Sequence, residues 1–144
     1  AVVAPGCLDM VNFGERQTVP EKYAGRTFYI HNPQVTLMRT TPAECTALGH
    51  MVAAKINASH GPVSVLIPRR GVSVISEEGG PFHDPHADAA LFNAIETALR
   101  PGIPCTSLDC TINDPVFART CVEALLAHIR RLPMEARGVS REES

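Results

Sequence analysis

Apolar residues recur every three or four positions in three segments of the chain, the spacing that places side chains on one face of an α-helix. This pattern predicts helices over 42–58, 85–99 and 115–132. Shorter apolar runs without this period predict strands at 2–5, 27–30, 63–67 and 105–108, and an extended or strand-like segment at 35–39. The run at 63–67 is continuously apolar, which indicates burial on both faces.

Each predicted helix begins with a polar residue followed by proline: Thr41-Pro42, Asp84-Pro85 and Asp114-Pro115. The polar side chain can accept a hydrogen bond from a free backbone N–H of the first turn. Proline at the first helical position gives up only a donor that would have no partner. Strands that alternate with capped helices predict an α/β fold: a three-layer, Rossmann-like, mostly parallel sheet flanked by helices.

We expect one α/β domain over residues 1–132 and a charged, flexible tail over 133–144. The predicted strand at the start of the chain has no leading cap or turn. It indicates an incomplete unit, the C-terminal portion of a larger two-subdomain protein. Such a unit would complete its sheet with its own N-terminal portion or with a partner chain, and a homo-oligomer is also expected.

Composition narrows the function classes. A net charge of −2 provides no electrostatic attraction for nucleic acid or an anionic membrane, and the absence of tryptophan leaves few side chains for base stacking. No apolar run approaches the roughly 20 residues that span a bilayer. The five cysteines form no Cys-x-x-Cys pair, which is typical of a reduced, cytoplasmic protein.

Ligands of parallel α/β sheets bind at the carboxyl ends of the strands, so the loops that lead into the three caps are the expected site. The densest polar segment, 31–41, contains His31 and ends in Arg39, Thr40 and Thr41. An arginine beside free helix N–H groups suits phosphate or carboxylate. The alternative is that Arg39 pairs with a buried carboxylate and Thr41 only caps the helix.

Two further loops carry candidate residues. After the strand at 63–67, Gly71 allows close backbone approach to a ligand and Ser73 offers a hydroxyl, although the P-loop and Gly-x-Gly-x-x-Gly patterns are absent. Arg69 and Arg70 fit either phosphate contacts or an ordinary surface turn. The cluster at 83–88 has imidazoles and carboxylates, but a solvent-facing helix start explains it better than a metal site.

We therefore expect an anionic ligand with its phosphate beside Thr41 and Gly71. Asn113 and Asp114 would face sugar hydroxyls or a metal-bound water. The complete predicted site comprises Asp9, His31, Arg39, Thr40, Thr41, Gly71, Ser73, Asn113 and Asp114.

Four ordered motifs extend over nearly the whole chain, to about Leu132. They are Gly6-x-x-Asp9-Met10-Val11-Asn12-Phe13-Gly14, the segment HNPQVTLMRTTP at 31–42, Pro68-x-x-Gly71-Val72-Ser73 with Gly79-Gly80-Pro81-Phe82-x-Asp84-Pro85, and Ile112-Asn113-Asp114-Pro115-x-Phe117. With these motifs the chain resembles the family of the N-terminal ATP-binding domain of the tomato mosaic virus resistance protein. The resemblance implies that the domain binds ATP or another nucleotide and that a longer N-terminal portion precedes it.

Three functions remain open at this point. The first is a nucleotide- or phosphate-binding α/β module. The second is a small-molecule enzyme, a hydrolase or lyase acting on a carboxylated or phosphorylated substrate, with His31, Asp9 or Asp114 as acid–base groups. The third is protein interaction without catalysis. No residue is marked by the sequence as a nucleophile, so the catalytic residues are unknown.

Overall fold

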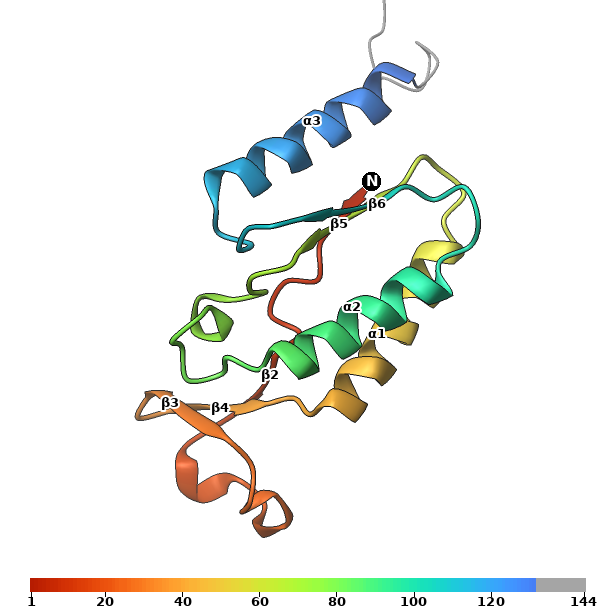
Figure 1. Ribbon diagram of the computed structural model, residues 1–144. Coiled ribbons are helices and arrows are strands. Elements are labelled where there is room, and N and C mark those ends of the chain that lie inside the picture. Colours follow the sequence, from red (N-terminus) through yellow and green to blue (C-terminus); the bar gives the residue numbers. More distant parts are fainter. Residues whose placement is uncertain (132–144) are drawn as a thin grey trace, which may run out of the picture.

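The computed structural model describes residues 1–131 (Figure 1). The strands are β1 (Val2–Val3), β2 (Met10–Phe13), β3 (Phe28–Asn32), β4 (Val35–Arg39), β5 (Ser64–Pro68) and β6 (Cys105–Leu108). The helices are α1 (Pro42–Asn57), α2 (Pro85–Ala98) and α3 (Pro115–Arg131), and short 3-10 turns lie at Arg16–Thr18, Glu21–Tyr23 and Val74–Ser76. The tail expected at 133–144 lies outside the described residues.

A parallel sheet with the strand order β1-β5-β6 forms the middle layer. Helices α1 and α2 cover one face of it and α3 covers the other (Figure 1). Alternate residues of β5 explain this arrangement, because Val65 and Ile67 pack in the core with Leu91 of α2, whereas Leu66 packs with Phe117 of α3. The predicted α/β fold, its three layers and the burial of both faces of β5 are confirmed.

A second sheet is antiparallel, with the order β2-β4-β3. Strand β4 lies in its centre, where Met38 pairs with Val11 on one side and Phe28 on the other. This sheet was not predicted from the sequence, and no strand was expected at β2. Two neighbouring residues of β2 are exposed, Val11 and Asn12, so the strand lacks the alternation that marks a half-buried strand.

The helix caps agree with the sequence prediction at two of three positions. Thr41 accepts a hydrogen bond from the Glu44 N–H in a capping box, and Asp84 accepts one from the Ala87 N–H. Asp114 differs, because its carboxylate accepts from the Thr111 N–H and so closes the preceding turn. All three helices begin on the side of the molecule where β5 and β6 end (Figure 1).

Some apolar surface remains open in the described part of the chain. The outer face of α3 exposes Val122, Leu125, Leu126 and Ile129. A groove of about 320 Å³ lies beside β1 and α1, where Val3, Val52 and Ile56 line it. Within residues 1–131, no helix has both the length and the apolar character needed to cross a bilayer.

Candidate functional site

The loops that follow the three parallel strands are tied together at the carboxyl edge of the sheet. The Cys7 N–H donates to the carbonyl oxygen of Val72 (2.9 Å), and the Ile112 N–H donates to that of Gly71 (3.0 Å). The Arg70 N–H donates to the carbonyl oxygen of Cys110 (3.0 Å). These cross-loop hydrogen bonds make one continuous surface from segments that lie far apart in the sequence.

Gly71 has a structural role in this surface. Its φ of +149° lies in a region that side-chain-bearing residues rarely adopt. A Cβ at this position would also lie 3.0 Å from the Cγ atom of Glu77. Glycine therefore allows the loop after β5 to fold back against the segment that contains Glu77.

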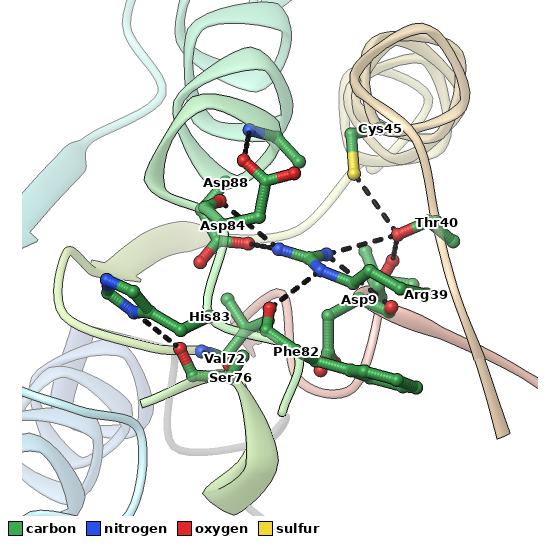
Figure 2. Close-up of polar contacts among 12 residues, drawn as sticks. Asp9, Arg39, Thr40, Cys45, Val72, Ser76, Phe82, His83, Asp84 and Asp88 are labelled. Atoms are coloured by element: carbon green, nitrogen blue, oxygen red, sulfur yellow. Dashed lines mark hydrogen bonds and ion pairs between the residues drawn. The ribbon is translucent and has the colours of Figure 1, made fainter. Parts of the chain in front are cut away.

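Arg39 lies at the end of β4 and is only 5% exposed. Its guanidinium donates to the carbonyl oxygens of Phe82 (2.9 Å) and Asp84 (3.3 Å) and forms an ion pair with Asp88 (2.5 Å). Figure 2 shows the guanidinium between the loop that leads into α2 and the backbone near Thr40. Arg39 thus holds β4 to α2, which is the structural alternative considered for it above. Its predicted role as an anion ligand stays a prediction.

Burial dominates the electrostatics around this ion pair. It raises the pKa of the Asp88 carboxyl, and the neighbouring Arg39 guanidinium opposes that rise. It also raises the pKa of the Cys45 thiol, whose sulfur lies 3.2 Å from the Thr40 hydroxyl. The Cys45 thiol therefore stays protonated at neutral pH and is a poor nucleophile.

Asp9 lies at the centre of the same buried cluster and is fully buried. Its Oδ2 accepts a hydrogen bond from the Ser73 hydroxyl (2.7 Å), and its backbone carbonyl accepts one from the Thr40 N–H (3.0 Å). The other carboxylate oxygen, Oδ1, has no hydrogen-bond partner among residues 1–131. The structure thus brings together four of the predicted site residues: Asp9, Arg39, Thr40 and Ser73.

A second group of polar residues lines an open cavity of about 150 Å³ at the carboxyl edge. The lining residues are Arg70, Glu77, Glu78, Thr111 and Asp114. The Arg70 side chain is 55% exposed, and its nearest carboxylate oxygen, on Glu78, is 3.5 Å away. Of the predicted residues, Asp114 lines this cavity. Asn113 lies beside it, because its side-chain amide donates to the Glu77 carboxylate (3.4 Å).

Among these lining residues, only Asp114 was predicted from the sequence. Arg70 was a candidate together with Arg69, and the sequence does not tell the two apart. The structure separates the two, because Arg69 is paired with Glu96 and Ser107 at the sheet surface. Thr111 had a usable signal in its position two residues before Asn113, whereas Glu77 and Glu78 had none beyond their charge.

The last two predicted residues, Thr41 and His31, lie outside both groups. Thr41 is engaged with Glu44, and the Glu44 carboxylate also pairs with Arg26 (2.5 Å). A phosphate at the start of α1 would therefore approach a carboxylate, which is unfavourable. His31 is exposed on β3, with its ring centroid 6.4 Å from that of Tyr29. In the described part of the chain, no three His, Cys, Asp or Glu side chains are placed to hold a metal ion.

Comparisons with known proteins show that this chain matches one part of longer proteins. A UPF0261 protein of Rhizobium meliloti is 54% identical over 121 residues, which are 83% of this chain and 30% of that protein. A UPF0261 protein of Mesorhizobium japonicum is 52% identical over 79% of this chain and 29% of its own length. The chain thus spans less than a third of the length of these relatives.

The expected similarity to the tomato protein is also found. The ToMV resistance protein Tm-1 of Solanum lycopersicum is 34% identical over an alignment of 146 positions that covers 96% of this chain and 19% of that protein. The C-terminal domain of the uncharacterised protein family UPF0261 matches residues 1–129. With nearly all of its described length matched, the chain belongs to the UPF0261 family and corresponds to its C-terminal domain.

Proposed function

We propose that this domain binds a nucleotide, with ATP as the first candidate, or another phosphorylated small molecule, in the cavity beside Arg70. The observation that carries the proposal is the position of this cavity. It lies at the carboxyl edge of a parallel sheet, on loops that cross-loop hydrogen bonds hold in place. Open α/β sheets bind their ligands at this edge.

The lining of the cavity suits a ligand that carries both phosphate and hydroxyl groups. The exposed Arg70 guanidinium can contact a phosphate through two parallel hydrogen bonds. The carboxylates of Glu77 and Asp114 can accept hydrogen bonds from sugar hydroxyls. Three carboxylates beside one guanidinium would repel a bare polyphosphate, so a nucleotide that carries Mg²⁺ fits this lining better.

The cavity also limits how much of a nucleotide this domain can enclose. Its volume of about 150 Å³ is below the roughly 300 Å³ at which small-molecule pockets begin. The rest of the ligand would contact another part of the full-length protein, in keeping with the short share of the relatives that this chain covers. The resemblance to the ATP-binding domain family of the tomato protein favours the same ligand class.

Titration calorimetry of the full-length protein with ATP, ADP and pyrophosphate, each with Mg²⁺, tests the proposal. Arg70→Ala should weaken binding roughly 10- to 100-fold, because a charged hydrogen bond is lost. Arg119→Ala is the matched control, since Arg119 is exposed on α3 and does not line the cavity. Unchanged affinity in a folded Arg70→Ala protein would exclude this cavity as the phosphate site.

The open apolar surface supports a second proposal, that the domain packs against the N-terminal portion of its own protein. The groove beside β1 and α1 is almost wholly apolar, and Val3 and Ile56 line it next to the strand edge that β5 does not use. The Val2 N–H lies on the edge of β1 that faces away from β5, because Ser64 is bonded to Ala1 and Val3 in the parallel register. Hydrogen–deuterium exchange of the full-length protein should therefore be slow at Val2. Fast exchange there would contradict the proposal and favour contact elsewhere, including a second copy of the chain.

A further inference from the structure

A second cavity, of about 250 Å³, lies at the opposite edge of the parallel sheet, where β5 and β6 begin. Its lining residues belong to the loop before β5, the loop before β6 and the end of α3. Three lining side chains can be positively charged or donate hydrogen bonds: Arg100, His128 and Arg131. This cavity is separate from the one beside Arg70.

The two cavities differ in charge. Three carboxylates line the cavity at the carboxyl edge. The cavity at the opposite edge has two positively charged side chains, Arg100 and Arg131, and no carboxylate among its described lining residues. Such a lining attracts anions.

Arg100 is held in position at this edge by the end of α1. Its backbone N–H donates to the side-chain oxygen of Asn57 (2.8 Å), and its guanidinium donates to the carbonyl oxygen of Ser59 (3.2 Å). The guanidinium contact uses one of five N–H donors. A planar guanidinium oriented in this way can still bind an oxyanion through its remaining donors.

His128 provides an independent observation. It is only 8% exposed, and its Nε2 lies 2.8 Å from the Ser64 hydroxyl. The other ring nitrogen, Nδ1, is buried and has no hydrogen-bond partner within residues 1–131. Buried polar atoms of native proteins are nearly always paired, so the unpaired nitrogen is an unusual feature of a ring that lines the cavity.

The protonation state of His128 fits a hydrogen-bonding role. Burial, together with the positive charges of the Ala1 amino group and Arg131, lowers the pKa of His128. The ring is therefore neutral at neutral pH. When Nε2 accepts from Ser64, Nδ1 carries the proton and can donate it.

The positions of the two arginines have a partial explanation in the helix dipole, because a cation at the carboxyl end of a helix is stabilising. α3 ends at Arg131, and Arg100 follows the end of α2. This explanation does not supply a partner for His128.

We propose that this cavity is an anion-binding site for a small phosphate- or carboxylate-bearing molecule. Arg100 and Arg131 bind the oxyanion, and the ring of His128 forms part of the wall beside it. The volume accommodates one oxyanion with a short carbon skeleton. The site differs from the nucleotide site proposed at the opposite edge in its charge, because no carboxylate is among its described lining residues, and neither proposal depends on the other.

The test uses the full-length protein and follows the side-chain NMR signals of His128 during titrations with inorganic phosphate and with malonate. Saturable shifts are expected, and competition between the two probes shows whether the site prefers phosphate or dicarboxylate. Arg100→Ala should weaken binding roughly 10- to 100-fold, as expected for one lost charged hydrogen bond. The affinity of Arg100→Lys should lie between those of the unchanged protein and Arg100→Ala, because lysine retains the charge but lacks the planar guanidinium.

A control variant separates this site from other effects. Arg119→Ala, on the same helix as Arg131, should leave the shifts of the His128 signals with both probes unchanged. Failure of phosphate and malonate to shift the His128 signals would overturn the proposal. Equal weakening in Arg119→Ala would overturn it too, because that result indicates a general effect of net charge.

Discussion

Arg39 is the last residue of strand β4 and Arg70 follows strand β5, and the surroundings of the two arginines differ completely. Arg39 is 5% exposed and contacts Phe82, Asp84 and Asp88, whereas the Arg70 side chain is 55% exposed with one long contact to Glu78. The difference comes from their interaction partners. Arg39 is paired with Asp88, which lies on α2, 49 positions further along the chain. A dense polar segment in the sequence can therefore hold a fold together, while a less conspicuous arginine remains available to a ligand.

The largest expected effect comes from Arg39→Ala, which leaves the Asp88 carboxylate buried without its partner. Loss of one member of a buried ion pair costs about 3–5 kcal/mol of unfolding free energy. Urea denaturation of the full-length protein, with α2 followed by a site-specific probe, measures this. Arg70→Ala is the matched comparison and should change stability by less than about 0.5 kcal/mol. Similar costs in both variants would contradict the distinction drawn between the two arginines.

The double variant Arg39→Met with Asp88→Ala sharpens the same comparison. Removal of both charges leaves no unpaired buried ion, so the double variant should recover most of the stability that Arg39→Ala loses. A double-mutant cycle that also includes Arg39→Met and Asp88→Ala as single variants measures the coupling. Additive losses would mean that Arg39 acts mainly through the carbonyl oxygens of Phe82 and Asp84.

Ser73→Ala is expected to have an intermediate effect. The Ser73 hydroxyl is the described hydrogen-bond donor to Asp9 and also caps the turn Val74–Ser76. Without it, both carboxylate oxygens of a fully buried aspartate lack partners, at a cost of about 1–3 kcal/mol. Thermal unfolding measures the loss, and nucleotide titration should show no more than a small change. A large loss of affinity without a loss of stability would move the ligand site from Arg70 to Asp9.

Local signals in the sequence predicted much of the fold. The capping box at Thr41 and the continuous apolar run of β5 depend on neighbouring residues, so both could be found without a structure. Strand β2 could not, because its pairing with β4 joins Met10 to Arg39, and β3 and two 3-10 turns lie between these residues in the sequence. Tertiary contacts of this kind leave little trace in local periodicity.

The surroundings of the candidate site residues could be derived from the sequence less well than the fold, for the same reason. The loops after the parallel strands do lie together, because cross-loop hydrogen bonds join them. Arg39 and Arg69 form ion pairs with Asp88 and Glu96, and nothing near either arginine in the sequence indicates these partners. The cavity itself forms only where Thr111 and Glu77 meet, so its lining could not be derived from spacing.

The smallest expected effect concerns Glu44, whose ion pair with Arg26 is an exposed counterpart of the Arg39–Asp88 pair. The hydrogen bond from Arg26 lowers the pKa of Glu44 below its usual value of 4.5. A carboxyl with a lowered pKa in the folded state contributes stability above its unfolded pKa, and this contribution is lost as the pH falls through the folded value. The Glu44 side chain is 42% exposed, so solvent screening keeps the contribution within the roughly 0–1 kcal/mol of surface pairs. Unfolding free energies of the full-length protein and of Glu44→Gln, measured from neutral pH downward, should differ most at neutral pH and converge below pH 4.5. A difference that persists at low pH would contradict an electrostatic origin, because glutamine retains the capping-box hydrogen bond with the Thr41 N–H.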